Sequence, residues 1–459
     1  MNDLHTAALT AEIAHATGAA ALVNAGLDRN LVDLNRVSAA CAHAPRFLER
    51  LAALLGAALA RHGRAVLLAV HGWNVVQPVV DLGTGARAGV ADAYAAVSPA
   101  FAATAVPALR AALAAAGIGT TVGARYPARA RENLLQLFTR RYRDDSRPVV
   151  RALAALADRV EAVQLELGIP LRWPGPWRAR LVAALARAAP ALAVAGAATA
   201  ELQDVAPAAR ARGHALEFVA GALAGTVRLD AQGGRLLILP RDGDLLLFTG
   251  DAAAARRPGE AGVLEAEPTA GGGLRVRYAG PLLRLPDSTA FLDLERGLER
   301  AALGEGTLDL TLTGGTGFGR VHGRARIDGA VIVIDGHGFA GQARPDPGAG
   351  GGLRLSLRLD GRTGLALAAP AEGGPAHGHL HRDGAVVPVE RAQVRLGAAA
   401  LAHLHVDAEV PGGPCLRLRA AAAREVPVAR RGLLATLRLP GQHGLAGWAE
   451  LAHPLPFSS

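Results

Sequence analysis

The spacing of apolar residues changes character about halfway along the chain. Up to about residue 212, long segments rich in Ala, Leu and Arg alternate with short apolar runs. This alternation is typical of helices that follow buried strands, and it predicts an α/β domain. We predict helices over residues 6–17, 44–61, 106–116, 147–157 and 177–188. We predict strands over residues 19–24, 65–70, 118–124 and 161–167.

The second half has short alternating segments instead. A stretch rich in Ala and Pro, 189–213, suits a connector or a peripheral helix, and segments such as TVRLD, RLLILP and LRVRY follow it. Asp-Gly pairs beginning at Asp242, Asp328 and Asp383 supply the positive φ angles that tight hairpins require. An antiparallel sheet of this many strands should close as a barrel or sandwich, because closure hides its edges. We therefore predict domains at 1–195 and 215–459, with a linker at 196–214.

Composition restricts the protein class. Hydrophobic residues make up 51% and charged residues 19% of 459 residues, which is enough apolar material for two or three domain cores. All 49 basic residues are arginines, giving a net charge of +9, but they are spread evenly and do not alternate with aromatics. We therefore expect no nucleic-acid partner. No apolar run predicts a membrane span, and residues 1–9 do not resemble a secretory signal.

The two cysteines, Cys41 and Cys415, lie far apart and form neither a disulfide framework nor a cysteine metal motif. Their scarcity is typical of a reducing compartment, so we expect a cytoplasmic protein. The sequence predicts no oligomeric state.

Two polar residues stand at the ends of predicted strands in the first half. His71, followed by Gly72, ends the run VLLAV, where it is either a metal ligand or a histidine held by hydrogen bonds. The glycine would let the backbone approach closely. Glu166 lies inside the apolar run VQLEL, and an unpaired carboxylate is costly to bury. It therefore pairs with a cation, acts as a general base, or faces solvent from an edge strand.

Two further motifs are less specific by themselves. The tetrad Asp33-Leu34-Asn35-Arg36 favours a helix cap followed by a surface arginine. The glycine-rich DLGTG beginning at Asp81 lacks the lysine of a P-loop, so an ordinary surface turn is favoured over a phosphate site.

Taken in order, these motifs resemble the N-formylglutamate amidohydrolase family, zinc-dependent hydrolases related in fold to zinc carboxypeptidases. The family carries a D-[VL]-N-R motif, a strand ending in HS or HG, an L-G-T turn with an Asp, and a Q-[IL]-E-[IL] strand. The matching segments here are 33–36, 71–72, 81–85 and 164–167, and the resemblance covers about residues 1–190. It implies a three-layer α/β domain that hydrolyses an N-acyl, N-formylglutamate-like or γ-glutamyl amide bearing a carboxylate.

The resemblance also implies roles for single residues. His71 would be a zinc ligand, and Glu166 would be the general base and proton shuttle. Asn35 and Arg36, with Arg140 or Arg141 of the basic segment 131–142, would hold the substrate carboxylate. An arginine suits this role because its planar fork binds carboxylates through two hydrogen bonds.

The chain departs from the family at its beginning. Family members start with a P-H-[SG]-G motif whose histidine is a further zinc ligand, followed by an acidic ligand, whereas this sequence begins after that motif. We expect Asp3 or His5 to stand near the acidic position. Two interpretations stay open: the start codon lies farther upstream, or the protein is a catalytically degenerate member that binds an apolar ligand in its β domain.

The second half carries its own resemblance, from about Leu216 onward. The segment GTGFGRVHGRARIDGAVIVIDGHGF, 315–339, leads into strands and therefore is no dinucleotide fingerprint. It resembles the lipocalin-like carotenoid hydratases and tocopherol cyclases, which implies a β-barrel with an apolar ligand. The D-H-S-W-G motif of that family is replaced by GQAR here. In HGHLH, His377, His379 and His381 share one strand face, and exposed histidines are favoured over a metal site.

Overall fold

The protein is described from a computed structural model of residues 1–459. Described residues run from 3 to 452, except 30, 87–93, 194–212, 222, 232, 241–243, 252–260, 287–293, 315–316, 343–351, 361, 371–373, 384, 398–399, 410–414, 429–431 and 440–445. They divide into two compact units, the first ending at 193 and the second beginning at 213. The expected linker, 196–214, lies almost wholly outside the described residues, so its bounds stay a prediction. Among these residues, no helix has the length and apolarity needed to cross a bilayer.

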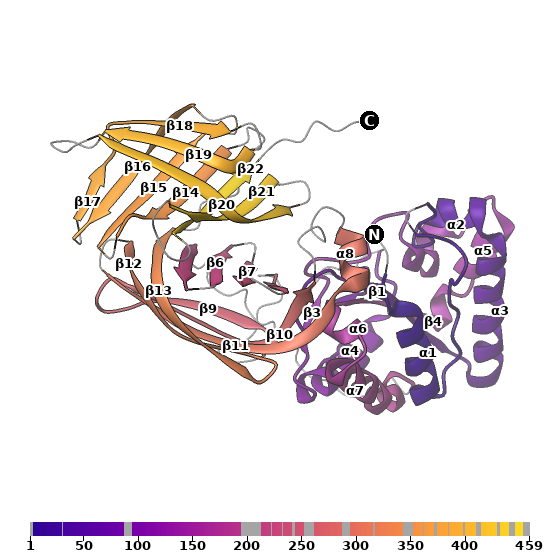
Figure 1. Ribbon diagram of the computed structural model, residues 1–459. Coiled ribbons are helices and arrows are strands. Elements are labelled where there is room, and N and C mark those ends of the chain that lie inside the picture. The colour runs from indigo at the N-terminus through magenta and orange to yellow at the C-terminus, as the bar shows by residue number, and fades with distance from the viewer. Residues whose placement is uncertain are drawn as a thin grey trace. The chain divides into compact units, whose positions relative to one another are not determined.

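The first unit is built on a four-stranded mixed sheet in the order β1-β4-β2-β3. Figure 1 shows β1, β3 and β4 of this sheet among the helices of the unit. The strands are β1 (Ala65–Gly72), β2 (Val79–Gly83), β3 (Gly119–Val122) and β4 (Val160–Leu167). β1 runs parallel to β4 and β2 parallel to β3, while β2 and β4 are antiparallel. The α/β character of this half is thus confirmed in a small mixed sheet, and the zinc-carboxypeptidase-like arrangement stays a prediction.

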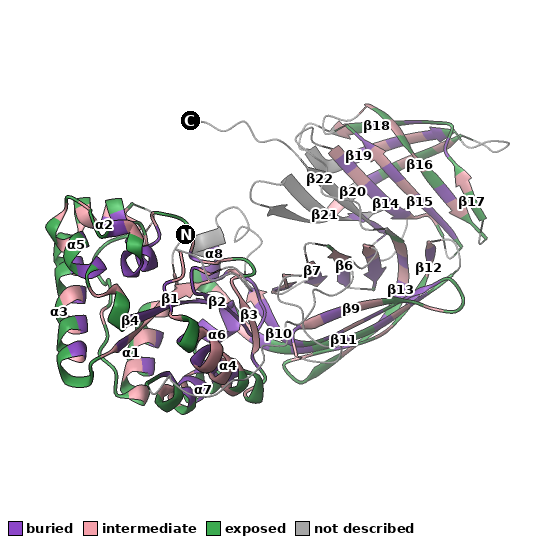
Figure 2. Cartoon of the chain, turned by 180° about the vertical axis from the view of Figure 1, so that it is seen from behind, coloured by how far each residue is buried: buried purple, intermediate pink, exposed green. Residues whose placement is uncertain are grey.

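Helices pack on this sheet in two groups. One contains α1 (Thr6–Thr17), α4 (Pro99–Ala115) and α7 (Pro176–Ala193), and α7 contacts both of the other helices. The other contains α2 (Val37–His43), α3 (Pro45–His62), α5 (Pro148–Ala154) and the short η1 (Leu134–Phe138). Short helices η2 (Arg140–Tyr142), η3 (Ala157–Arg159) and α6 (Ile169–Arg172) complete the unit. Figure 2 shows the buried faces of these helices turned inward and their exposed faces turned outward.

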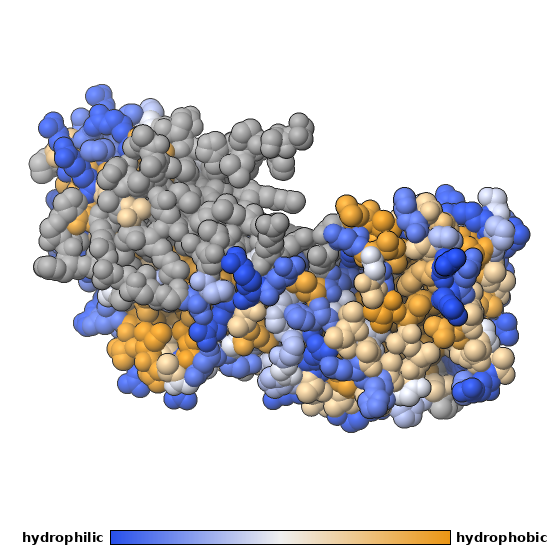
Figure 3. Space-filling model, turned by 45° about the vertical axis from the view of Figure 1, so that its right-hand side comes forward, coloured by the Kyte–Doolittle hydropathy of each residue, from blue (hydrophilic) through white to orange (hydrophobic). Residues whose placement is uncertain are grey.

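The apolar spacing of α3 explains its place. Leu48, Leu51, Leu55 and Leu59 recur at intervals of three and four residues and are all buried. They pack against the face of β1 and β4 that carries Ala65 and Ala162. Figure 3 shows strongly and weakly hydrophobic surface on this unit between scattered hydrophilic side chains, as the low charged fraction of the chain leads one to expect.

Two expectations for the first half are wrong. Residues 19–24 form no strand, since this exposed, alanine-rich segment offers little apolar surface for a sheet to bury. The DLGTG segment is no surface turn: Asp81 lies in β2, whose residues are all buried. Residues 189–193 lie in α7, in agreement with the peripheral helix that is one of the two interpretations of 189–213, because Ala188 and Leu192 continue its buried stripe past Pro190.

The second unit is antiparallel β structure, as predicted. Its first sheet contains β5 (His214–Ala220), β6 (Leu223–Asp230), β7 (Gly233–Pro240), β8 (Leu245–Thr249), β9 (Val263–Pro268), β10 (Leu274–Leu285), β11 (Ala302–Thr313), β12 (Phe318–Ile327) and β13 (Ala330–Gln342), with α8 (Leu294–Arg300) before β11. The pairing of β10 with β11 closes this sheet into a barrel. Asp328 and Gly329 both have positive φ, which confirms the expected tight hairpin between β12 and β13.

A second sheet follows. It contains β14 (Gly352–Arg358), β15 (Thr363–Ala369), β16 (Gly374–Arg382), β17 (Ala385–Pro388), β18 (Arg391–Gly397), β19 (Ala400–Glu409), β20 (Leu416–Val428), β21 (Gly432–Arg438) and β22 (Gly447–Ala452). β15 also pairs with β16, so the strand order returns on itself. Alternate residues such as Leu353, Leu355 and Leu357 fill one core. The Asp-Gly pair at Asp242 lies outside the described residues, whereas Asp383 has the expected positive φ.

Candidate functional site at the ends of β1 and β4

The two polar residues singled out at strand ends lie directly across from each other. His71 on β1 pairs in register with Glu166 on β4, and Ala69 pairs with Gln164. Residues opposite each other on neighbouring strands point to the same face, so His71, Gln164 and Glu166 share one face of the sheet. Both polar strand ends are therefore brought to one place.

Asp3 reaches this place from the segment before α1. Its Oδ2 lies 3.2 Å from His71 Nδ1, and its Oδ1 accepts a hydrogen bond of 2.9 Å from the backbone N–H of Gly72. The guanidinium of Arg29 forms an ion pair with Asp3 and lies 3.5 Å from His71 Nδ1. Hydrogen bonding to His71 and the positive charges nearby hold the pKa of Asp3 below its usual range, despite the opposing effect of burial.

Glu166 has a perturbed acidity. Its side chain is only 6% exposed, and burial raises its pKa from 4.5 to about 7. The carboxylate of Asp3 also raises the pKa, while His71, Arg29 and a hydrogen bond from Gln164 lower it. A carboxyl group that titrates near neutral pH can both accept and return a proton, which is the property a general acid–base catalyst needs.

An amide relay positions Glu166. Gln164 Nε2 donates a hydrogen bond of 2.7 Å to Glu166 Oε1. The Oε1 atom of Gln164 accepts from Asn133 Nδ2 at 2.9 Å and from Asn35 Nδ2 at 3.5 Å. Asn35, predicted as a substrate-binding residue, is thus linked to the predicted base through a single side chain.

Arg172, a buried arginine that the sequence analysis did not single out, lies beside Gly72 at the site. Arg172 is fully buried and donates hydrogen bonds to the carbonyls of Leu4, Trp73 and Leu167. Burial lowers its pKa to about 10. A Cβ at Gly72 would lie 2.5 Å from Arg172 Nη1, so the predicted close backbone approach at this glycine accommodates the arginine. No signal in LGIPLRW distinguishes Arg172 from a surface arginine.

The remaining predicted residues make their described contacts elsewhere. His5 packs its ring edge-on against Trp173, with centroids 4.6 Å apart. Arg36 is exposed and lies 3.3 Å from Asp33. Arg141 stacks over the ring of Tyr94 at 3.6 Å, and Arg140 is exposed.

An open groove of about 1520 Å³ leads to the site. It is bounded by α1, α3, α7, β1 and the segment before Asp33, and Asp3, Arg29 and His71 lie along it. β1 is an edge strand of its sheet and forms part of the groove wall. The groove therefore reaches Asp3 and His71, and Glu166 is the neighbour of His71 on β4.

The donors fit a metal only in part. His71 Nδ1 and Asp3 Oδ2 converge, and an imidazole nitrogen with a carboxylate oxygen is a donor pair that zinc uses. A catalytic zinc takes three protein ligands, and among the described residues no cluster of three or more His, Cys, Asp or Glu is arranged to hold a metal. The arrangement thus accounts for two ligand positions.

Comparisons with known proteins add little to this picture. No protein family matches the sequence, and no curated protein matches it. Among solved structures, the chain is similar to kievitone hydratase from Nectria haematococca at 8% identity, with 53% of this chain and 89% of that chain covered and a TM-score of 0.28. A similarity this distant carries no argument, so the function rests on the residues of the chain itself.

Proposed function

We propose that the first unit is a zinc-dependent amidohydrolase that acts on an N-acyl amino acid such as N-formylglutamate, or on a γ-glutamyl amide. One observation carries the proposal: Glu166 lies in register with His71, and His71 lies 3.2 Å from Asp3. The pair His71 and Asp3 supplies metal donors, and the neighbouring carboxyl group supplies the base. The resemblance of the ordered motifs to N-formylglutamate amidohydrolases supports the same reaction.

Each residue of the site has its own role in the proposed reaction. Glu166, held by Gln164 and titrating near pH 7, takes a proton from the attacking water and returns it to the leaving amine. Zinc held by His71 and Asp3 would polarise the scissile carbonyl and acidify water. The exposed side chain of Arg36 would bind the substrate carboxylate, and Asn35 donates to Gln164, which holds the base.

The test compares matched variants for hydrolysis of N-formyl-L-glutamate by the full chain supplied with zinc. We expect Glu166→Gln and His71→Ala to lower kcat/KM by about 100-fold or more, because each removes a group that acts in the transition state. The exposed residues Glu49 and His15 provide the controls Glu49→Gln and His15→Ala, which should keep full activity. Full activity in Glu166→Gln would exclude the proposed base.

A second candidate function has its own supporting observation. Arg29 forms an ion pair with Asp3 and approaches His71. Its positive charge can neutralise the Asp3 carboxylate in a protein that binds no metal there. In this case the protein is a degenerate relative that binds an apolar ligand in its closed β-barrel. Elemental analysis and solvent extraction of the purified chain distinguish the two: stoichiometric zinc favours the hydrolase, and co-purified lipid without zinc favours the binding protein.

A further inference from the structure

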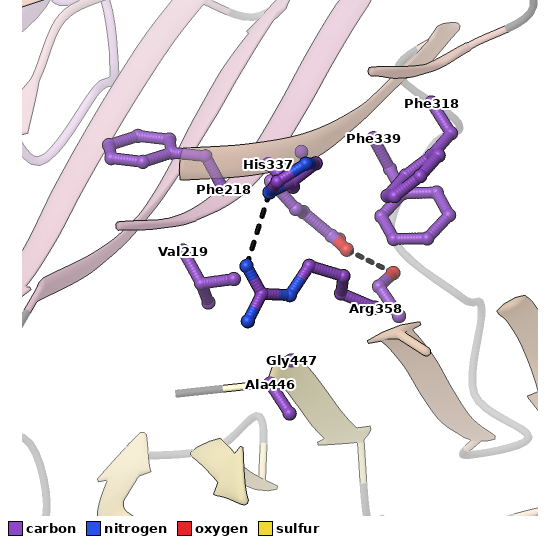
Figure 4. Close-up of a pocket in the computed structure, with 11 residues that line it drawn as sticks. Phe218, Val219, Phe318, His337, Phe339, Arg358, Ala446 and Gly447 are labelled. Carbon is purple, nitrogen blue, oxygen red and sulfur yellow. Dashed lines mark hydrogen bonds between the residues drawn. The ribbon is translucent and has the colours of Figure 1, made fainter. Parts of the chain in front are cut away.

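Two hollows in the molecule differ greatly in size. The cleft lined by Arg358 and Phe318 in the second unit (Figure 4) has a volume of about 10 Å³, which is room for about one water molecule. The groove beside β1 in the first unit holds about 1520 Å³. Pockets for small molecules usually measure roughly 300–1,000 Å³, so this groove has room for a longer occupant.

β1 is an edge strand whose sequence is that of a central strand. Its residues 65–70, AVLLAV, are apolar throughout, which is typical of a strand covered on both faces inside a sheet. Exposed edges are usually protected by charged side chains or by proline, and this run contains neither. β4 pairs with one edge of β1, and no other strand in the described part of the chain pairs with β1.

The outer edge of β1 presents backbone groups to the groove. The N–H of Trp73 donates to β4, whereas the N–H of Gly72 points the other way and donates to Asp3. Because N–H groups alternate between the two edges of a strand, every second residue before Gly72 also presents its N–H outward, namely Val66, Leu68 and Val70. Among the described residues, no backbone hydrogen bond reaches these three N–H groups.

The groove has apolar walls from both helix groups of the unit. α3 contributes Leu51 and Leu54, and α1 and α7 contribute Ile13 and Leu185. Val23, in the segment after α1, also lines the groove and is 38% exposed although it is apolar. An occupant that covers these walls therefore needs apolar side chains toward both groups of helices.

The groove has a basic end. Arg61 and His62 lie at the end of α3, just before β1, and both are exposed. At the other end of β1, Asp3 and Arg29 already neutralise each other in an ion pair. An acidic group on the occupant is therefore favoured beside Arg61 and His62.

A peptide fits these features better than a hydrocarbon chain does. A hydrocarbon chain would cover the walls but would bury the outward N–H groups of β1 without an acceptor, which costs free energy. An extended peptide supplies backbone carbonyls for these groups as well as apolar side chains for the walls. Strand addition of this kind is a common way for an exposed sheet edge to bind a peptide.

We propose that this groove binds an extended, apolar segment of another polypeptide, which adds to the outer edge of β1 and places an acidic residue beside Arg61 and His62. Its backbone pairs with Val66, Leu68 and Val70. A second copy of this chain is a poor source of the segment, because its own β1 lies between helices in the same way. The proposal concerns binding alone and does not rest on the proposed hydrolase.

The test titrates a fluorescent peptide of alternating valines and leucines, with a glutamate at each end, into the full chain in EDTA. Fluorescence anisotropy should show saturable binding that weakens at least 10-fold in Leu54→Glu, which places a charge on the groove wall. Ala53→Glu, at an exposed position of α3 outside the groove, should bind as the wild type does. Far-UV circular dichroism and the melting temperature verify that each variant is folded. Absence of saturable binding, or equal binding by Leu54→Glu, would overturn the proposal.

Backbone methylation separates strand addition from contact through side chains alone. Two versions of the peptide carry N-methyl groups on alternate residues, one version for each edge of the added strand. The version methylated on the edge that faces β1 should lose at least 10-fold in affinity, and the other should bind like the parent peptide. The parent peptide should also slow hydrogen exchange at Val66, Leu68 and Val70. Equal affinities of the two methylated versions, or unchanged exchange in β1, would reject strand addition.

A peptide with glutamines in place of its glutamates tests the basic end of the groove. It should bind more weakly than the parent peptide at low salt, because it lacks the charge that Arg61 and His62 attract. Equal binding of the two peptides would reject the assigned place of the acidic residue.

Two other occupants are outcomes of the same experiments. If laurate displaced the fluorescent peptide at a lower concentration than the unlabelled peptide does, the groove would be a site for an acyl chain. If the free chain were a dimer by light scattering and Leu54→Glu were a monomer, the occupant would be a second copy. Either result would overturn the proposal, whereas a failure to hydrolyse amides would leave it standing, since binding is measured in EDTA.

Discussion

Glu166 and Asp81 lie directly across from each other on antiparallel strands, yet their carboxylates are in opposite situations. Asp81 accepts hydrogen bonds from Thr121 and from the backbone N–H groups of Ala124, Arg125 and Tyr126. Glu166 has a single described hydrogen-bond donor, Gln164, and a pKa of about 7. The first carboxylate organises a loop, whereas the second is left able to exchange a proton.

The raised pKa of Glu166 predicts how stability depends on pH. The folded unit binds this proton more tightly than the unfolded chain does, so protonation stabilises it fully below about pH 4.5, and the contribution is lost as the pH rises to about 7. The rise in the pKa of Glu166 from 4.5 to about 7 corresponds to a change of ~3 kcal/mol in the free energy of unfolding across this pH range. We expect Glu166→Gln, which mimics the protonated form, to gain stability relative to the wild type between pH 5 and pH 8.

Denaturant unfolding in EDTA measures this difference without interference from metal. Trp73, Trp173 and Trp177, three of the four tryptophans, report on the first unit by fluorescence. Asp3, whose pKa is lowered from 3.8, acts below this pH window. If the free energy of unfolding differed between the wild type and Glu166→Gln by the same amount at every pH, the raised pKa would be contradicted.

Gln164→Leu should raise the pKa of Glu166 above 7. The amide of Gln164 donates to Glu166 Oε1 and thereby favours the charged carboxylate, so its removal favours the neutral form. The pH at which stability declines should move upward in the same unfolding series. Gln393→Leu, at an exposed position of β18, serves as the control. A downward movement would show that the amide does not stabilise the carboxylate.

Arg172→Met should destabilise the first unit by about 3 kcal/mol or more, because three carbonyls lose a buried donor. The change in the free energy of unfolding is measured by denaturant titration. Arg187→Met alters an exposed arginine of α7 and should stay within about 0.5 kcal/mol of the wild type. If the two variants lost the same free energy of unfolding, the buried hydrogen bonds of Arg172 would contribute no more to stability than an exposed helix arginine does.

Gly364→Ala should destabilise the second unit by about 1–3 kcal/mol, since the new Cβ would overlap the rings of Phe318 and Phe339. Scanning calorimetry follows the loss. Gly341→Ala is the matched control, because its Cβ would meet nothing within 4 Å. A Gly364→Ala protein as stable as the control would mean that the two rings can move apart freely.

Sequence patterns predicted the elements whose own residues decide their structure. The apolar run 65–70 became β1, and the alternation from Leu274 onward became long antiparallel strands. A surface turn is expected over 81–85 because the glycines of DLGTG dominate a local interpretation. The burial of residues 81–83 in β2 depends on pairing with β3 and β4, which lie far along the chain. Such long-range pairing overrides local preference.

The site was predictable in part for the same reason. His71 and Glu166 stand out because polar residues at the ends of apolar strands are costly unless they are used. Asn133 and Arg172 were not singled out, because nothing in NLLQLF or LGIPLRW shows which groups these two side chains contact. Only the folded chain shows that Asn133 supports Gln164 and that Arg172 fills the space beside Gly72.

The contacts of the first helix also bear on synthesis. Arg172 holds the carbonyl of Leu4, and Arg178 holds Glu12 through two hydrogen bonds, so partners about 166 residues apart must both exist before the beginning of the chain is anchored. During synthesis on a ribosome, the segment that carries Asp3 therefore cannot form these contacts until α7 has emerged. The contacts that anchor the segment bearing Asp3 at the candidate site are therefore completed only after α6 and α7 have been synthesised.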